Sequence, residues 1–269
     1  MIKSILKAVD VLQIFGVDEP RLTLMEIANR LDMPKGTTHN ILSTLLSCGF
    51  VERTDDGRYA LGTAIIPLTQ AVRINAELRD RAAPLLRELA DDCRESAYLV
   101  ALDGDYALYI YAVESPRRLS ARTAVGARVP LHCVATGKAI LSGLTQEEIA
   151  GIVDRAGLRR YTETTITDID ALHQELEQTR ERGYSIDRGE HEAGVYCVGA
   201  PILDARGRVI GSCSVSGLDP EIIRGRRSEL SARVMHTAQQ ISRRMGYVPA
   251  RPSSIVVEPT IADAAEVSN

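Results

Sequence analysis

The stretch from residue 22 to residue 61 most constrains what this chain can fold into. It predicts two short helices joined by a tight break, followed by a β-hairpin. The first helix is expected at residues 24–31, because Thr23 and Glu26 stand at the spacing of a capping box. The break follows at Pro34, since the residue before a proline is pushed out of the α region.

The second helix, which ends at Gly49, is predicted to bury one face and expose the other. Its apolar side chains fall on one narrow stripe: Ile41, Leu42, Leu45 and Leu46. In a helix-turn-helix the second helix enters the major groove N-terminus first, because side chains there reach the base edges. We therefore expect DNA contacts from the polar and basic side chains of its first turns: Lys35, Thr37, Thr38, His39 and Asn40.

The hairpin is predicted to form a wing beside these helices. Residues 50–53 and 58–61 alternate around Asp56-Gly57, and Asp-Gly is a strong hairpin turn signal. Arg53 and Arg58 lie near the tip, where they would meet DNA phosphates. The alternative is a helical packing motif that happens to precede a hairpin. Because the cap, the break, the stripe and the wing agree, the pattern favours DNA binding.

The length and net charge of the chain limit which kind of DNA-binding protein it can be. The 269 residues are enough for two domains. The net charge is -4, and residues 1–61 hold seven Lys or Arg against eight Asp or Glu. This balance argues against strong, non-specific binding to nucleic acid, which depends on phosphate neutralisation. It argues less against a specific dimer, because Lys35, Arg53 and Arg58 fall on one predicted face.

Composition also bears on the compartment. No apolar run approaches the roughly 20 residues that a membrane span needs. The first 16 residues predict a helix and lack the small-residue cleavage site of a signal peptide. The five cysteines are widely spaced without any CxxC pair, which is typical of reduced thiols. We expect a cytoplasmic protein without a membrane partner.

The remaining elements predict an α+β arrangement. A first helix at residues 2–15 is expected to cover the helix-turn-helix with Ile5, Leu6, Val9, Leu12 and Ile14. Two helices follow the wing, at residues 63–75 and 78–94, and the first is a candidate linker and dimerisation helix. Strands are then predicted at 97–103, 106–114, 119–125, 184–190, 195–203 and 208–217, and helices at 135–144, 145–156, 168–182 and 219–245. This order indicates an antiparallel sheet with helices grouped apart.

The predicted organisation is therefore a DNA-reading domain at residues 1–61, a linker helix at 62–76, a sensor domain at 77–249 and a disordered acidic tail at 250–269. Ser212, Ser214 and Ser216 alternate on the last strand, so they share one face. A row of hydroxyls suits a small polar ligand, although it could also follow a solvated face. The backbone N–H groups of Ala135 and Thr136, at a predicted helix start, could hold a carboxylate.

Five segments together resemble the IclR family of bacterial transcription regulators, over about residues 3–248. They read LTLMEIANRLDMPKGTTHNILSTL, GFVERTDDGRYALG, VESPRRLSARTAVGARVPLHCVATGKAIL, RERGYSIDRGEHEAGVYCVGAPILD and GSCSVSGL. The resemblance implies a winged helix-turn-helix and a GAF-like (profilin-like) effector domain. It also implies dimers or tetramers on partly palindromic double-stranded DNA operators. Two positions depart from the family: Gly36 replaces its usual serine, and Asn40 replaces a frequent arginine with a side chain suited to adenine.

The same resemblance implies that six positions line a pocket for a small organic effector, which we expect to carry a carboxylate: Ala135, Thr136, Asp187, Cys197, Ser214 and Ser216. Asp187 would repel an anion, so we assign it to a ligand hydroxyl or to a pocket N–H group. Cys197 could instead be a small buried hydrophobe. The sequence leaves open the effector, the target genes, the sign of regulation and the choice between dimer and tetramer.

Enzyme and metal functions are the alternatives to this interpretation. Cys197 with His132 or His191 could suggest a cysteine nucleophile, and Asp187, His191 and Cys197 could suggest a metal site. No local spacing such as HExxH, GxSxG or paired CxxC supports either. We therefore expect no catalytic residues, no metal ligands and no cofactor. The alternative that stays open is a metal- or redox-sensing regulator that uses Cys133 and Cys197.

Overall fold

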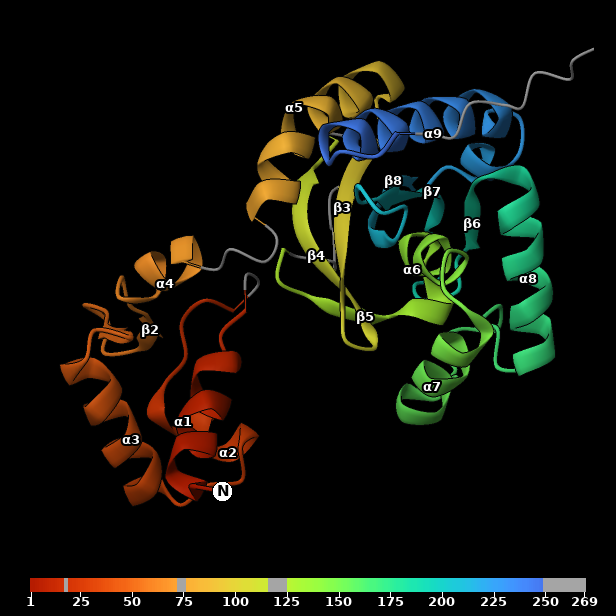
Figure 1. Cartoon of the computed structure of the whole chain (residues 1–269). Helices are drawn as coiled ribbons and strands as arrows, with labels where there is room; N and C mark the ends of the chain where they lie inside the picture. The colour runs from red at the N-terminus through yellow and green to blue at the C-terminus, as the bar shows by residue number, and fades with distance from the viewer. Residues whose placement is uncertain (17–18, 72–75, 116–124, 249–269) are drawn as a thin grey trace, which may run out of the picture.

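The computed structural model describes residues 1–16, 19–71, 76–115 and 125–248. The predicted tail at 250–269 lies outside these ranges, as do all but the last residue of the strand expected at 119–125. In Figure 1 the elements up to α4 group together, and those from α5 onward form a second body around one sheet. None of the helices in the described ranges combines the length and apolar character of a membrane span.

The N-terminal body is a winged helix-turn-helix. It contains α1 (Lys3–Gln13), α2 (Leu24–Arg30), α3 (Lys35–Ser47), the hairpin strands β1 (Val51–Arg53) and β2 (Tyr59–Leu61), and α4 (Ile65–Ala71). The predicted capping box is present: the Glu26 amide donates to Thr23 Oγ1 at 3.2 Å, and the Thr23 amide donates to Glu26 Oε2 at 2.7 Å. Gly49 and Gly57 take the positive φ angles that the helix end and the wing turn require.

Two expectations about which side chains this body buries were wrong. Thr38 is fully buried and its hydroxyl donates to the Pro34 carbonyl, so it joins the apolar stripe with Leu42 and Leu45 instead of facing DNA. The reason is spacing, since position 38 lies one turn before Leu42 on the same helix face. In α1 the side chain that enters the core is Val11. The predicted inward residues Ile5, Leu6 and Val9 are exposed, whereas Leu12 and Ile14 pack partly against the core.

The second body is an α+β domain with a six-stranded antiparallel sheet in the order β5-β4-β3-β8-β7-β6. The strands are β3 (Ser96–Asp103), β4 (Tyr106–Val113), β5 (Arg128–Pro130), β6 (Ser185–Arg188), β7 (Tyr196–Leu203) and β8 (Val209–Gly217). The short strand β5 was not predicted. It pairs with the start of β4 through Val129 and Arg128, next to the 3-10 helix at Leu131–Cys133.

Helices cover both faces of this sheet (Figure 1). On one face lie α5 (Ala76–Cys93) and α9 (Arg227–Arg244), packed on inward side chains such as Leu99 and Val215. On the other lie α6 (Ala135–Leu141), α7 (Gln146–Ala156) and α8 (Ile169–Arg182), packed on Tyr98 and Val100. The single helix expected from residue 219 is divided into a 3-10 helix at Pro220–Ile223 and α9, because the backbone leaves the helical region at Arg224.

Candidate functional site

The exposed face of α3 is the first candidate site. Lys35, His39 and Asn40 are exposed and Thr37 is half-buried, as a DNA-reading face requires. The same face continues C-terminally through three side chains that the sequence analysis did not select: Ser43, Thr44 and Ser47. The helical spacing already indicated this. Residues 43 and 44 lie three and four positions after Asn40, and residue 47 lies four positions after Ser43, so all of them share one helix face. No carboxylate lies on α3, so this face presents no like charge to phosphate.

The two arginines of the wing differ in their surroundings. Arg58 is 3.8 Å from a carboxylate oxygen of Glu26 and 3.7 Å from one of Asp56, and all three side chains are about half exposed. Arg53 is exposed, and within the described part of the chain no carboxylate forms an ion pair with it. Arg53 is therefore the wing cation that is more available to a phosphate.

The second candidate site is a pocket between α6 and the sheet, which we call the α6 pocket. It holds about 410 Å³ of space not filled by protein atoms, part of it open to solvent. Its lining contains all six residues that the resemblance implied, Ala135, Thr136, Asp187, Cys197, Ser214 and Ser216, together with Tyr98, Tyr109, Val134, His191, Glu192 and Val195. The structure thus brings the six predicted side chains to one place.

Strand register explains why these residues meet. Asp187 of β6 pairs with Cys197 of β7, which pairs with Ser216 of β8, so the three form one row across the sheet. Ser214 pairs with Gly199, and a Cβ at Gly199 would lie 3.0 Å from the Ala135 backbone. The glycine therefore lets the start of α6 approach the sheet and close the pocket. Ser212 shares the face but does not line the pocket, because its hydroxyl donates to the Thr136 carbonyl at 2.9 Å.

Six lining residues were not among those expected in the effector pocket, although His191 was considered as a metal ligand and as a partner of Cys197. Tyr98 and Tyr109 pack edge to face at a centroid distance of 5.6 Å and are both buried. Their place on predicted strands was visible, but the face that they share with Ser214 depends on pairing between distant strands. His191 and Glu192 come from a segment without a periodic pattern, and Val134 and Val195 lie directly before α6 and β7, so no local signal placed these four residues at the pocket.

The pocket presents hydroxyls and one thiol to its interior. Thr136 is 2% exposed, and its Oγ1 has no well-aligned hydrogen-bond partner in the described part of the chain. The Tyr109 hydroxyl lies near it: burial raises the pKa of Tyr109, and interaction with Thr136 opposes that rise. Cys197 Sγ lies 3.0 Å from Ser216 Oγ. A buried hydroxyl without a good partner is unfavourable unless a ligand supplies one.

Asp187 is the buried carboxyl group of the pocket. Its Oδ1 accepts two backbone hydrogen bonds, from the Gly189 amide at 2.9 Å and the Glu190 amide at 2.8 Å. Burial, and then repulsion by Glu190, raise the pKa of Asp187 to about 7, while Lys138 and the two amides oppose the rise. Asp187 therefore changes between a neutral and a charged group near neutral pH.

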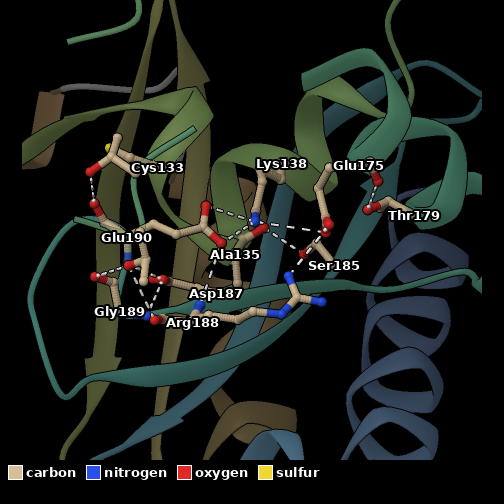
Figure 2. A network of polar contacts seen from close by, with 12 residues as sticks. Cys133, Ala135, Lys138, Glu175, Thr179, Ser185, Asp187, Arg188, Gly189 and Glu190 are labelled. Carbon is tan, nitrogen blue, oxygen red and sulfur yellow. Dashed lines mark hydrogen bonds and ion pairs between the residues drawn. The ribbon is translucent and has the colours of Figure 1, made fainter. Parts of the chain in front are cut away.

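Beside Asp187 lies a buried ion-pair network (Figure 2). Lys138 of α6 is fully buried, and its Nζ donates to both carboxylate oxygens of Glu190, at 2.6 and 2.8 Å. The same Nζ is 3.7 Å from Glu175 of α8, which also pairs with Arg182 at 2.6 Å and Arg188 at 3.4 Å. This network joins α6, α8 and the segment after β6.

Of the two cysteines named for a metal or redox sensor, Cys133 is buried and its thiol form is favoured. Burial raises the pKa of the Cys133 thiol, which donates to the Pro130 carbonyl at 3.4 Å. Burial also raises the pKa of Cys93 to about 11 and that of Cys213 to about 12. These thiols stay protonated near neutral pH, whereas metal binding and redox exchange need the thiolate. Within the described ranges, no three Cys, His, Asp or Glu side chains gather as a metal site would require.

Comparison with known proteins gives consistent matches. The family description "Bacterial transcriptional regulator IclR C-terminal" matches residues 70–243, and "IclR helix-turn-helix domain" matches residues 4–55. The chain is 32% identical to the HTH-type transcriptional regulator KipR of Bacillus subtilis over 91% of this chain and 98% of that one. Among the other relatives that it matches are further proteins named as transcriptional regulators or repressors.

Two solved structures are similar over nearly the whole chain. The IclR of Thermotoga maritima is 30% identical with a TM-score of 0.77, covering 92% of this chain and all of that one. An IclR homologue from Microbacterium hydrocarbonoxydans, complexed with 4-hydroxybenzoate, is 25% identical with a TM-score of 0.77, covering 90% of this chain and 98% of that one.

The buried network predicts that removing only its lysine destabilises the protein more than removing the lysine together with one of its carboxylates. Lys138→Met should lower the free energy of unfolding by about 3–5 kcal/mol, because it leaves buried carboxylates without their cation. Adding Glu190→Leu should restore a large part of this loss, since the uncompensated charge is then removed as well. Chemical denaturation of the two variants measures both effects. Equal stability of Lys138→Met and the wild type would show that the ion pair does not hold α6 in place.

Proposed function

Because the chain belongs to the IclR family of bacterial transcriptional regulators, we propose that it is a ligand-responsive regulator. In this proposal α3 and the wing bind a double-stranded DNA operator, and the α6 pocket binds a small organic effector that changes operator affinity. The main support for the proposal is that the six expected side chains, from α6, β6, β7 and β8, line one partly open pocket.

The proposed DNA contacts combine positioning with base reading. Lys35 at the start of α3 and Arg53 on the wing would contact phosphates, which set the register of the protein on the duplex. His39 and Asn40 would reach base edges from the first turns of α3. Arg58 contributes less in this proposal, because Glu26 and Asp56 already compete for its charge.

The proposed effector is a small carboxylic acid. The N–H groups of the first turn of α6, at Ala135 and Thr136, have no acceptors within the helix, and Thr136 Oγ1 lies beside them. No Lys or Arg is among the described residues that line the pocket. We infer that backbone N–H groups and hydroxyls, not a cationic side chain of this lining, hold the acid. The 4-hydroxybenzoate bound by the Microbacterium homologue is an acid of this kind.

We also propose that operator binding needs two copies of the chain. Four apolar side chains of α1 and its N-cap, Ile2, Ile5, Leu6 and Val9, are between 41% and 65% exposed and recur at helical spacing. An apolar stripe of this kind on a short helix marks a surface that another protein covers. A second copy is the occupant that suits a helix-turn-helix protein, because two reading helices then meet two half-sites of one operator.

The wing predicts a difference in salt dependence. Arg53→Ala should weaken binding to every operator alike and flatten the log–log salt slope by about 0.9 for each phosphate that is no longer neutralised. Arg58→Ala should have a smaller effect, because its charge is shared with two carboxylates. Fluorescence anisotropy on an operator selected from random duplexes measures both, with Arg233→Ala in α9 as a control. If Arg53→Ala keeps the wild-type slope, Arg53 does not contact phosphate.

The pocket predicts that ligand binding can be weakened while DNA binding is kept. Ser214→Ala with Ser216→Ala should weaken a bound acid at least about tenfold, since a hydrogen bond to a charged group is worth about 1.5–3 kcal/mol. Operator affinity without ligand should stay unchanged. Calorimetry with an acid found by thermal-shift screening tests this, and Ser231→Ala in α9 is the matched control. Unchanged ligand affinity would mean that the acid binds elsewhere.

The α1 stripe predicts an effect on assembly. Ile5→Asp with Leu6→Asp should lower the molecular mass measured by analytical ultracentrifugation. The reason is that two charged side chains would be placed in an apolar contact between two copies of the chain. The affinity of this double variant for the operator should also fall, whereas its affinity for the ligand should equal that of the wild type. Ser4→Asp, on the same helix, should change neither property. A double variant that keeps both its mass and its operator affinity would exclude α1 as the contact.

A further inference from the structure

The exposed face of α3 lacks the side chains that most often read guanine and cytosine. Between Lys35 and Ser47 the helix holds a single Lys or Arg, which is Lys35 itself, and no carboxylate. Guanine is most often read by an arginine or lysine that bonds to O6 and N7, and cytosine by a carboxylate that accepts from N4. Because Lys35 contacts phosphate in the proposed function, α3 is left without the usual reader of either base.

Asn40 is the side chain of this face that can recognise one base through two hydrogen bonds. It is exposed, and within the described ranges its side-chain amide makes no hydrogen bond. One turn earlier on the same face stands Gly36, where a Cβ would meet no atom of another part of the chain within 4 Å. The space beside Asn40 is therefore open to a base edge. An asparagine amide bonds to N6 and N7 of adenine together.

Thr44, one turn after Asn40, presents a methyl group to the same surface. Its side chain is exposed, and its hydroxyl donates to the Asn40 carbonyl at 2.9 Å. A hydroxyl has only one proton, so Thr44 has none left to donate to a base. Ser47 is committed in the same way, because its hydroxyl donates to the Thr44 carbonyl at 2.7 Å. The methyl group of Thr44 suits the C5-methyl group by which thymine is recognised in the major groove.

The spacing of these two side chains limits the spacing of the bases that they contact. Four residues of an α-helix rise about 6 Å, and successive base pairs lie about 3.4 Å apart. A helix in the major groove therefore places Thr44 within about two base-pair steps of the base that Asn40 contacts.

We propose that α3 requires two A·T pairs in each operator half-site. Asn40 bonds to N6 and N7 of an adenine, and Thr44 packs its methyl group against a thymine within about two steps of it. This inference rests on the proposed DNA-binding function of α3 and names the class of sequence that α3 selects. Asn40 and Thr44 then determine specificity, whereas Lys35 contributes affinity that does not depend on sequence.

Selection of duplexes from a random pool tests the proposal. The full chain is incubated with duplexes that hold a random stretch of about 20 base pairs, long enough for two half-sites one helical turn apart. Each enriched half-site should hold an A·T pair whose replacement by G·C weakens binding about 5- to 150-fold in fluorescence anisotropy. Half-sites that tolerate G·C at every position would overturn the inference alone. Failure to enrich any duplex would overturn the proposed function of α3 as well.

Two modified bases test which atoms are contacted. 7-Deazaadenine removes the N7 acceptor of adenine, and deoxyuridine removes the methyl group of thymine. 7-Deazaadenine should weaken binding by the wild type but not by Asn40→Ala. Deoxyuridine should weaken binding by the wild type but not by Thr44→Ser, which keeps the hydroxyl that bonds to the Asn40 carbonyl. Equal losses in the wild type and the variants would mean that DNA shape sets the A·T preference, and would overturn the proposal.

Asn40→Arg tests whether residue 40 reads a base. An arginine bonds to O6 and N7 of guanine, so a new selection should replace adenine with guanine at one position of each half-site. Lys35→Ala, on the same helix, should weaken binding to every duplex and retain the A·T preference. Both side chains are exposed, so neither change removes a core contact. An Asn40→Arg chain that selects the same duplexes as the wild type would overturn the assignment of Asn40.

Discussion

The ion pair between Lys138 and Glu190 is the interaction on which the rest of the pocket depends. Lys138 lies in α6 and Glu190 follows β6, so one buried contact joins two segments that border the α6 pocket. Glu190 also contributes the backbone amide that orients Asp187. Charges this deeply buried are costly unless they are paired. The position of the Asp187 carboxyl group in the pocket is therefore linked to the position of α6.

The sheet makes a polar pocket possible inside an apolar domain. Alternation sends Cys213 and Val215 into the core beneath α5 and α9, while Ser214 and Ser216 face α6. Strand pairing then aligns Ser216 with Cys197 and Asp187, from strands that are neighbours in space. The N-terminal domain follows a simpler rule: one helix face is buried on its own core, and the opposite face remains for DNA.

Local patterns predicted the winged helix-turn-helix and the α+β class of the second body. The capping box at Thr23, the turn at Gly57 and the serine alternation on β8 each follow from a few adjacent residues, and the structure contains all three. What could not be predicted depends on distant contacts. Thr38 has a polar side chain but is buried. Which apolar side chains of α1 are exposed depends on how that helix packs against the rest of the N-terminal body. The charge network of Lys138 pairs residues 52 positions apart, which no local spacing indicates.

The central claim is that a ligand in the α6 pocket and DNA on α3 bind to one coupled molecule. Thermodynamic linkage requires that each ligand change the affinity of the other by the same factor, typically about 5- to 150-fold. The most direct measurement is the operator Kd with and without the tightest-binding acid, together with the Kd of that acid with and without operator. The account predicts one common factor well above or below unity. An operator Kd that does not change with a saturated pocket would contradict it.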